Sequence, residues 1–263
     1  MNPSCQCDPE VRTVEVWANE HGLQVQDLGT TDRARDLTEG CGLVIALGGD
    51  GTILRALQLA LWHHVPVLGV NYGHLGFLAD IDGNELESTL DRVARGEAQI
   101  DERTALVATP RTGEPQSVVA FNDFVISRVA GHGSARLHVE VSGERVLDVT
   151  GDGLVIASPT GSTAYNVEAG GPVVSPTLDA ILLTPLAAQG TPLRSMVIDG
   201  SDTIRIVSAE RSAPLVGEVD GRTSRDMPTP VTVDIHTAAG KARLVRTRPR
   251  TFYGDLARRG VST

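Results

Sequence analysis

An uninterrupted apolar run that ends in glycine constrains the fold more than any other feature of this sequence. Residues 42–47 read Gly-Leu-Val-Ile-Ala-Leu and lead directly into Gly48-Gly-Asp-Gly-Thr52. Such a run is typical of a strand that is buried on both faces, as strands of parallel sheets are. Residues 52–63 follow with apolar side chains at helical spacing. The sequence therefore predicts a strand–turn–helix unit, the building block of an α/β sheet.

Strand and helix patterns continue to alternate up to residue 100. Residues 65–70 read Val-Pro-Val-Leu-Gly-Val and predict a second strand, and residues 85–95 predict an amphipathic helix. A weaker helical pattern covers residues 11–23. Strands that alternate with helices favour an N-terminal α/β domain with a parallel sheet.

The pattern changes after residue 100, where short strands separated by Gly, Pro and Asp turn signals replace the helices. Such spacing is typical of a largely antiparallel, β-sandwich-like domain. A helical pattern returns at 252–259, so we expect two domains, residues 1–100 with 246–263 and residues 101–245. The predicted short strands cover 104–109, 118–127, 137–141, 145–149, 154–158, 203–207, 231–236 and 242–247.

The charge balance narrows the class of ligand. The 263 residues include 33 Asp and Glu against 23 Lys and Arg, a formal net charge of −10. Nucleic-acid binding normally needs a basic patch, so DNA and RNA are disfavoured, whereas a small phosphate site needs only local N–H groups. No apolar run reaches membrane-spanning length, so no membrane partner is expected.

The cysteines indicate a reducing compartment. There are three, an odd number without a disulfide framework, which favours a cytoplasmic protein. Cys5 and Cys7 form a Cys-x-Cys pair, but no second pair stands at zinc-site spacing. A frayed terminus is therefore favoured there over a metal site.

The glycine turn has the composition of a phosphate cradle. Gly48 and Gly49 let the backbone approach a ligand closely, and the N–H groups of a helix starting at Thr52 add the positive end of its dipole. The turn matches neither a Walker loop nor the Gly-x-Gly-x-x-Gly pattern. A carboxylate in an anion cradle is costly without a function, so Asp50 is predicted to accept a hydroxyl proton or to help hold Mg²⁺. The alternative is that Asp50 is only the helix N-cap.

The segment Asn71–Phe77 follows the second strand and should lie beside the glycine turn, because α/β sheets bind ligands at the carboxyl ends of their strands. Phe77 is expected to pack on a base or a nicotinamide, with a core aromatic as the alternative. His74 could donate to phosphate, but a lone loop histidine is more often structural.

Asn122 and Asp123 interrupt an apolar strand, where they would point to opposite faces. An Asn side chain offers a donor and an acceptor to a base edge, and an Asp side chain accepts from ribose hydroxyls. We therefore interpret the pair as part of a binding site, with a β-bulge or turn as the alternative.

The segment from Asp152 to Tyr165 is a second rich motif. Its strand ends at Pro159 and is followed by small and hydroxylated residues before Tyr165. This composition predicts a ribose- and phosphate-binding turn at a helix start, with a Ser/Thr-rich N-cap as the alternative. The residues of this turn are Thr160, Gly161, Ser162, Thr163, Ala164 and Tyr165.

Together these motifs resemble the NAD kinase family, over most of residues 40–255. The Gly-Gly-Asp-Gly-Thr element is shared with lipid kinases of the diacylglycerol and sphingosine type. The Pro-Thr-Gly-Ser-Thr-Ala-Tyr element is far more specific to NAD kinases. The matching segments are Gly48–Thr52, Gly73–Phe77, Asn122–Asp123, Asp152–Tyr165, Ala169–Pro172 and Leu183–Pro185.

The resemblance implies a NAD kinase/diacylglycerol kinase-like fold, with the phosphate donor on the α/β domain and the dinucleotide on the β-rich domain. It implies a homodimer or homotetramer that uses ATP with Mg²⁺ or another divalent cation. Asp50 would be the base that activates the adenosine-ribose 2′-hydroxyl of NAD, which yields NADP. Asn122 would hold the adenine, and Asp123 with Asp152 the other ribose. The further nucleotide-binding residues would be Gly48, Gly49, Gly51, Thr52, Phe77, Thr160, Gly161, Ser162, Thr163, Ala164, Tyr165, Glu168 and Arg222.

Several positions depart from the family pattern and point to an edited acceptor pocket. Asp123 stands where Glu is usual, and Glu168 stands where a small Ser is common. Gln189 stands where His is usual, and Arg222 where Gln is frequent. The first strand of the fold and its Gly-Lys-like turn have no match either.

Three hypotheses for the function follow from the motifs and the departures. The first is a NAD kinase, and the second is a paralogue that phosphorylates a hydroxyl of another nucleoside or nucleotide. The third is a non-catalytic nucleotide-binding protein, which the missing first strand suggests and the retained Asp50 opposes. A lipid kinase is disfavoured because the second motif does not fit one.

Overall fold

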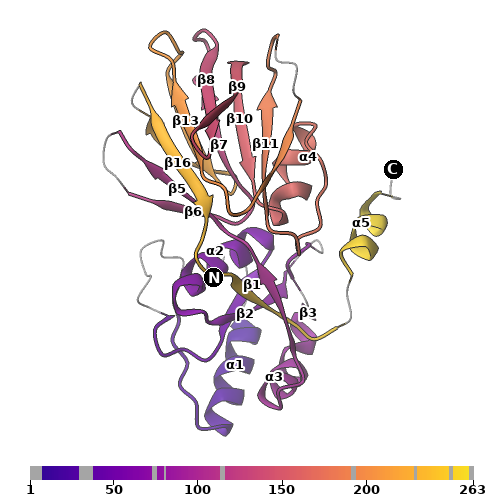
Figure 1. The fold of residues 1–263 in the computed structure, drawn as a ribbon. Helices are drawn as coiled ribbons and strands as arrows, with labels where there is room; N and C mark the ends of the chain where they lie inside the picture. Colours follow the sequence, from indigo (N-terminus) through magenta and orange to yellow (C-terminus); the bar gives the residue numbers. More distant parts are fainter. Residues whose placement is uncertain are drawn as a thin grey trace. The chain divides into compact units, whose positions relative to one another are not determined.

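The computed structural model describes residues 8–29, 38–72, 76–79, 81–112, 116–190, 194–227, 230–248 and 251–260. The chain divides into two compact units (Figure 1). The first unit comprises Met1–Glu102 and Gly240–Thr263, and the second comprises Arg103–Ala239. Cys5, Cys7 and His74 lie outside the described residues, so their predicted roles are not addressed by the structure.

A five-stranded sheet forms the centre of the first unit, in the order β1-β2-β17-β4, with β3 paired to β2. The β2 strand runs parallel to β1, β3 and β17. The predicted parallel layer of an α/β domain is thus confirmed. The strands are β1 (Val44–Gly48), β2 (Pro66–Asn71), β3 (Ile81–Asp82), β4 (Gln99–Arg103) and β17 (Ala242–Arg246).

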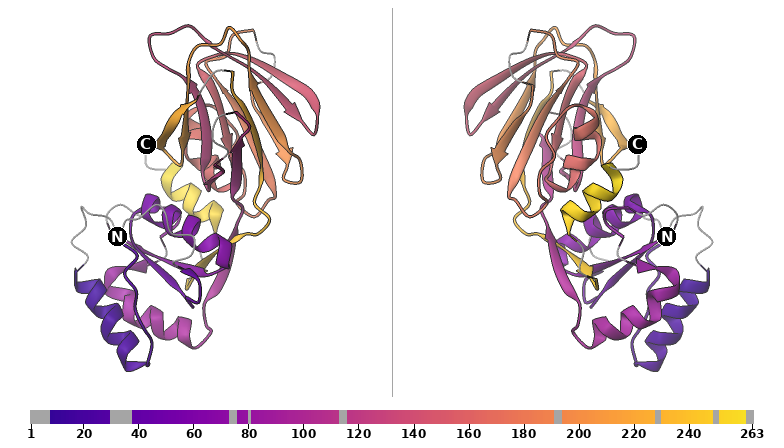
Figure 2. Two further views of the ribbon diagram at one scale, coloured as in Figure 1. Left: turned by 90° about the vertical axis from the view of Figure 1, so that its left-hand side faces the viewer. Right: turned by 90° about the vertical axis from the view of Figure 1, so that its right-hand side faces the viewer.

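Helices bury the apolar strands of this sheet. The α2 helix (Asp50–Ala60) starts directly after β1, and its Ile53 and Leu57 are completely buried. The α1 (Asp8–Glu20) and α3 (Leu86–Ala94) helices pack side by side (Figures 1 and 2), and Nε1 of Trp17 donates to Oδ1 of Asp91 at 2.7 Å. Among the described residues, no helix has the length and apolar content needed to cross a membrane. The remaining helices are η2 (Leu61–His63), η3 (Gly83–Glu85) and α5 (Phe252–Gly260).

The β17 strand corrects the expectation for residues 242–247. Their short-strand pattern predicts a place in the antiparallel domain, but Leu244 pairs with Val67 of β2 in the parallel sheet. That prediction is wrong because a local apolar pattern identifies a strand without identifying its partner. The C-terminal part of the chain therefore returns to the sheet that carries the glycine turn.

Two six-stranded antiparallel sheets form the second unit. One has the order β12-β11-β10-β7-β14-β15, and the other has the order β6-β5-β16-β13-β8-β9. One core cluster contains Ile126 and Ile156 of the first sheet together with Val139 and Ile206 of the second. The sheets therefore pack face to face (Figure 2), which confirms the β-sandwich-like class.

The elements of the second unit are short, as the turn signals predict. A single turn of helix, α4, follows the 3₁₀ helix η4 after β10. The strands and helices are β5 (Leu106–Pro110), β6 (Val118–Ala120), β7 (Asp123–Arg128), β8 (Ala135–Val141), β9 (Glu144–Gly151), β10 (Gly153–Ala157), η4 (Thr160–Thr163), α4 (Tyr165–Glu168), β11 (Ala180–Leu186), β12 (Met196–Asp199), β13 (Ile204–Ser208), β14 (Leu215–Val219), β15 (Arg222–Met227) and β16 (Thr232–Thr237).

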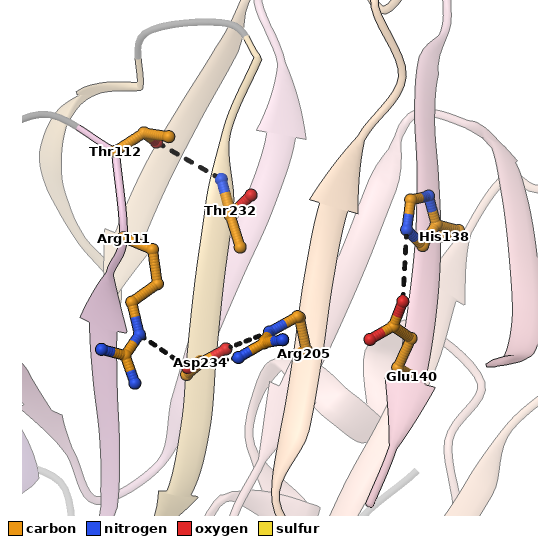
Figure 3. A network of polar contacts seen from close by, with 7 residues as sticks. All are labelled: Arg111, Thr112, His138, Glu140, Arg205, Thr232 and Asp234. Atoms are coloured by element: carbon orange, nitrogen blue, oxygen red, sulfur yellow. Dashed lines mark hydrogen bonds and ion pairs between the residues drawn. The ribbon is translucent and has the colours of Figure 1, made fainter. Parts of the chain in front are cut away.

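The outer face of the second sheet carries a polar network (Figure 3). In β16, Val233 and Ile235 belong to the core, so the alternation of a strand places Asp234 on the opposite face. Asp234 accepts hydrogen bonds from Nε of Arg111 and Nε of Arg205, both at 2.7 Å. The bond from Arg205 is the main cause that holds the pKa of Asp234 below its usual value. The network ties β16 to β13 and to the end of β5.

Candidate nucleotide site

The glycine turn joins β1 to α2, and the exposure of its glycines increases along the chain, from a buried Gly48 through a half-buried Gly49 to an exposed Gly51. A Cβ atom at Gly48 would lie 2.4 Å from Oγ1 of Thr52, so a larger residue does not fit there. Gly49 is the N-cap of α2 and makes no side-chain capping bond. Among the described residues, and apart from the adjoining residues and the backbone of α2 itself, no atom lies within 4 Å of a Cβ position at Gly49 or Gly51. An accessible helix N-terminus of this kind lets phosphate oxygens approach main-chain N–H groups.

Asp50 is the first residue of α2, and its carboxylate is turned toward a second loop. The N–H of Phe77 donates to Oδ2 at 2.8 Å, and the N–H of Leu78 donates to Oδ1 at 3.1 Å. The alternative that Asp50 is the N-cap is therefore wrong, and α2 begins before the predicted start at Thr52. Phe77 itself is half-buried. Each carboxylate oxygen of Asp50 keeps a further lone pair that a ligand hydroxyl can use.

Arg246 of β17 binds the carbonyl groups of the same two residues, Phe77 and Leu78. Its Nη1 donates to the carbonyl of Leu78 at 3.0 Å, and its Nη2 donates to the carbonyl of Phe77 at 3.1 Å. Nε of Arg246 also pairs with Asp101 at 3.4 Å. The main chain of Phe77 and Leu78 thus lies between Arg246 and Asp50 and is hydrogen-bonded to both. Sequence analysis missed Arg246, and a charged residue directly after the apolar pair Leu244-Val245 is the available signal.

Asn122 and Asp123 lie where the chain passes from β6 to β7. Asn122 is in the bend, and Asp123 is the first residue of β7. The expectation that both belong to one strand is wrong, because the bend ends β6 before Asn122. The N–H of Ser158 donates to the carbonyl of Asn122 at 2.9 Å, and a Cβ atom at Gly161 would lie 2.0 Å from that carbonyl oxygen. The Asn122–Asp123 motif and the Asp152–Tyr165 motif are therefore in direct contact.

Asp123 is a buried carboxyl group with a neighbouring negative charge. It is 3% exposed. Burial, and to a smaller extent the charges of Asp220 and Glu218, together raise its pKa to about 7. A buried carboxyl group that titrates near neutral pH is typical of functional sites.

The turn after β10 contains hydroxyl groups with different roles. Ser162 is buried and its Oγ donates to the carbonyl of Val174 at 3.0 Å, so it supports the fold. Oγ1 of Thr160 is buried and has no hydrogen-bond partner among the described residues. Residues 163 and 164 are half-buried, and Tyr165 is 44% exposed. Residues 163–165 are therefore the part of this motif that a ligand can reach.

Asn166 is a buried polar residue that sequence analysis missed. Its Nδ2 donates to the carbonyl of Pro172 at 2.9 Å, and its Oδ1 accepts from Oγ1 of Thr184 at 2.8 Å. A Cβ atom at Gly171 would lie 2.3 Å from Oδ1 of Asn166. This residue therefore fastens α4 and the Gly-Gly-Pro loop to β11. An amide directly after Tyr165 is the signal that was available.

The structure does not bring Asp152 to Asp123. Asp123 pairs with Ala157 at one end of β10, whereas Asp152 precedes Gly153 at the other end. The two ends are about 16 Å apart at about 3.3 Å per residue. Asp152 is exposed and forms an ion pair with Arg128 at 2.6 Å. Within one chain, Asp152 and Asp123 therefore do not share a ribose.

The remaining predicted residues are exposed. Arg222 pairs with Val219, and Val219 pairs with Phe124, so Arg222 lies at the Asp123 end of its sheet. Glu168 is the last residue of α4. Gln189 donates its N–H to the carbonyl of residue 150 at 2.9 Å. In the described part of the chain, no three His, Cys, Asp or Glu side chains gather as a metal site.

Comparison with protein families gives two matches that cover both units. Residues 6–98 match the ATP-NAD kinase N-terminal domain, and residues 121–247 match the ATP-NAD kinase C-terminal domain. The chain is 38% identical to the NAD kinase of Heliobacterium modesticaldum over 84% of this chain and 79% of that protein. It is 42% identical to the NAD kinase of Symbiobacterium thermophilum over 84% of this chain and 78% of that protein.

Two solved structures have a similar fold. Yeast NADH kinase complexed with NADH aligns with a TM-score of 0.77 and 28% identity, over 84% of this chain and 67% of that one. A NAD kinase from Archaeoglobus fulgidus in complex with ATP aligns with a TM-score of 0.78 over 94% of each chain. The second pair shares 23% identity, so it supports the fold alone.

Proposed function

We propose, from the premise that the chain belongs to the NAD kinase family, that it transfers the γ-phosphoryl group of ATP to the adenosine-ribose 2′-hydroxyl of NAD. The product would be NADP. The observation that carries the proposal is Asp50, a carboxylate at the N-terminus of α2 in an accessible glycine turn. A carboxylate at a phosphate cradle suits a reaction in which a hydroxyl must lose its proton to attack a phosphoryl group.

Asp50 acts as the general base in this proposal. The N–H groups of Phe77 and Leu78 hold one lone pair of each carboxylate oxygen and so orient the group. The free lone pairs accept the proton of the 2′-hydroxyl as its oxygen attacks the γ-phosphorus. The phosphates of ATP lie against the N–H groups of the glycine turn, where the helix dipole favours negative charge.

The magnesium ion belongs to the substrate in this proposal. ATP carries Mg²⁺ or another divalent cation on its phosphate oxygens, which are the hard ligands that such cations prefer. The cation offsets the negative charge that the transferring phosphoryl group and its leaving group develop. The chain needs to contribute the cradle and the base, and both lie in the first unit.

The acceptor pocket is assigned to the second unit. Asn122 holds the adenine, and Asp123 accepts a hydrogen bond from a ribose hydroxyl. Residues 163–165 line the pocket, and Arg222 offers a cation at the same end of the sheet for a phosphate. We assign the protein to the cytoplasm as a homodimer or homotetramer, with NAD and ATP as its small-molecule partners.

Direct assay of the purified chain tests this function. The chain is incubated with NAD, ATP and MgCl₂, and NADP is measured with an NADP-specific dehydrogenase. Parallel reactions replace ATP with polyphosphate and NAD with NADH. NADP formation that requires both substrates supports the proposal, and its absence with intact nucleotide binding would oppose it.

A paralogous kinase is the second candidate, because Glu168 and Arg222 depart from the family pattern and both are exposed. A thermal-shift panel of NAD, NADH, ADP-ribose and nucleosides, followed by phosphorylation assays on the compounds that bind, separates it from NAD kinase. Restoring the common residue with Glu168→Ser should raise activity on NAD if another compound is the natural acceptor.

A further inference from the structure

The Asp220 carboxylate gathers three consecutive main-chain N–H groups. Its Oδ1 accepts from the N–H of Phe121 at 3.0 Å, of Asn122 at 2.7 Å and of Asp123 at 3.2 Å. Its Oδ2 accepts a second bond from Phe121 at 3.1 Å. Asp220 is separated from this segment by 97 to 99 positions in the sequence, so the contact is tertiary.

The backbone of Asp220 completes the attachment. Its own N–H donates to the carbonyl of Asp123 at 3.0 Å, so the two residues are bonded in both directions. Asp220 lies in the turn between β14 and β15 with a φ of +48°, in the left-handed region. Asp and Asn tolerate this region better than most residues with a side chain. The turn therefore suits a residue that is both short and able to accept hydrogen bonds.

The attached segment contains the residues assigned to the acceptor. Phe121 is completely buried and anchors the bend in the core. From the other side, Ser158 donates its N–H to the carbonyl of Asn122 and its Oγ to the carbonyl of Phe121. Asp220 and Ser158 thus satisfy the donors and the acceptors of the same bend. The main chain of Asn122 is fixed on both sides, while its side chain is half-exposed and can meet a ligand.

We propose that Asp220 is a positioning residue of the acceptor site, which sets the affinity for the dinucleotide by fixing the main chain of Asn122 and Asp123. Asp220 acts through the two neighbouring residues and not on the reacting atoms. The inference rests on the proposed function for the identity of the ligand. Its geometric part, the control of the bend by one carboxylate, stands on the hydrogen bonds alone.

Two substitutions separate hydrogen bonding from backbone conformation. Asp220→Asn keeps an acceptor oxygen at Oδ1 and tolerates the positive φ. Asp220→Gly also tolerates the positive φ but removes the acceptor. Ser142→Gly is the matched control, since Ser142 has a φ of +49° in the β8–β9 turn of the same unit and its Oγ donates to Asp202.

Three measurements are made on the full chain: KM and kcat for NAD, the Kd for NAD by calorimetry, and hydrogen exchange of residues 121–123. For Asp220→Gly, we expect KM and Kd to rise about 10- to 100-fold, since main-chain donors left without an acceptor cost about that much. The kcat should change little, and exchange at 121–123 should accelerate. At pH 8, above the pKa of Asp123, Asp220→Asn and Ser142→Gly should stay close to the wild type in all three.

Other outcomes would overturn the proposal. One is an Asp220→Gly chain with wild-type Kd and wild-type exchange. Another is a loss of kcat at constant KM, which would place the effect in the chemical step. Equal damage in Asp220→Asn and Asp220→Gly would assign the effect to the negative charge. A wild type that binds NAD without phosphorylating it defeats the proposed function, but its Kd series still decides the role of Asp220.

Discussion

The carboxylate of Asp50 lies against the backbone of Gly76, in a space that only a glycine at position 76 leaves open. A Cβ atom added to Gly76 would lie 1.8 Å from Oδ1 of Asp50, far inside any permitted contact. The next two residues along the chain, Phe77 and Leu78, donate their N–H groups to the same carboxylate. The loop is therefore shaped around Asp50, and the carboxylate is held by main-chain atoms.

Gly76→Ala should reduce kcat by displacing the carboxylate. Misplacement of a catalytic group by about 1 Å costs on the order of 10²-fold in rate, and we expect a loss of that size. Gly42→Ala is the control, because among the described residues no atom lies within 4 Å of a Cβ position there. Steady-state kinetics and thermal unfolding check both variants. A Gly76→Ala enzyme with normal kcat would refute the proposed fit of loop and carboxylate.

Asp50→Asn should abolish most of the activity while preserving the fold. Gly49 is the N-cap, so no capping bond is lost. The amide can keep one of the two main-chain bonds, and losing the other costs about 1 kcal/mol. An amide cannot take the hydroxyl proton, so kcat should fall by roughly 10²–10⁴. ATP binding should persist or strengthen, because a negative charge leaves an anion site.

The matched control for Asp50→Asn is Glu87→Gln, an exposed acidic residue in the first turn of α3. Its kcat should equal that of the wild type. Near-normal turnover of Asp50→Asn, or a protein that does not fold, would show that the general-base assignment is mistaken. Circular dichroism and calorimetric titration with ATP distinguish these cases.

Arg246→Met should lower both stability and activity. It removes the donors to the carbonyls of Phe77 and Leu78 and leaves Asp101 without this partner. Buried groups left without partners cost about 1–3 kcal/mol each, so the urea midpoint should fall clearly. The kcat should also fall, because the main chain of Phe77 and Leu78 orients Asp50. Arg243→Met on the same strand is the control, since Arg243 makes only an exposed 3.4 Å bond to the carbonyl of His64 among the contacts described.

The ion pairs of Asp234 with Arg111 and Arg205 should stabilise the second unit at neutral pH and lose this effect in acid. Asp234 has a lowered pKa, so its contribution is present above the unfolded value of 3.8 and is lost as pH falls below it. Because Arg111 and Arg205 are largely exposed, Asp234→Asn should cost only about 1 kcal/mol at pH 7. Urea unfolding at pH 7 and pH 3 measures the difference. An equal cost at both pH values would contradict the ionic origin.

Local patterns predicted the elements of the site better than their contacts. The β1–turn–α2 unit follows from an apolar run and helical spacing within one segment. The partners of Asp50 are main-chain N–H groups 27 and 28 positions away. Because nearly every residue has such a group, the sequence does not show which of them Asp50 binds. The contact between Asp220 and Asn122 could not be predicted for the same reason, since Asp220 binds a main-chain N–H group 98 positions away. The family resemblance groups Asp152 with Asp123, whereas the length of β10 separates them in the structure.

Because the pKa of Asp123 is raised in the folded protein, the free energy of unfolding should fall as pH rises. Its folded pKa is about 7 against an unfolded value of 3.8, so the folded protein binds the proton more tightly. The favourable contribution is complete below pH 3.8 and is lost as pH rises through about 7. At about 1.4 kcal/mol per unit, the whole effect is at most about 4 kcal/mol. Asp123→Asn should flatten this part of the profile, which urea unfolding between pH 4 and pH 8 measures.

The affinity for NAD should change with pH in the opposite direction. Burial and the charges of Asp220 and Glu218 keep Asp123 mostly protonated at pH 6, and its cross-strand neighbour on β10 is the uncharged Ala157. A protonated carboxyl group is a weaker acceptor for a ribose hydroxyl than a carboxylate, so the Kd for NAD should fall as pH rises through about 7. Calorimetry at pH 6, 7 and 8 checks the trend, and Asp123→Asn should remove it. If Asp123→Asn kept the wild-type pH dependence, another group would have to carry it, and the assignment of Asp123 to the ribose would fail.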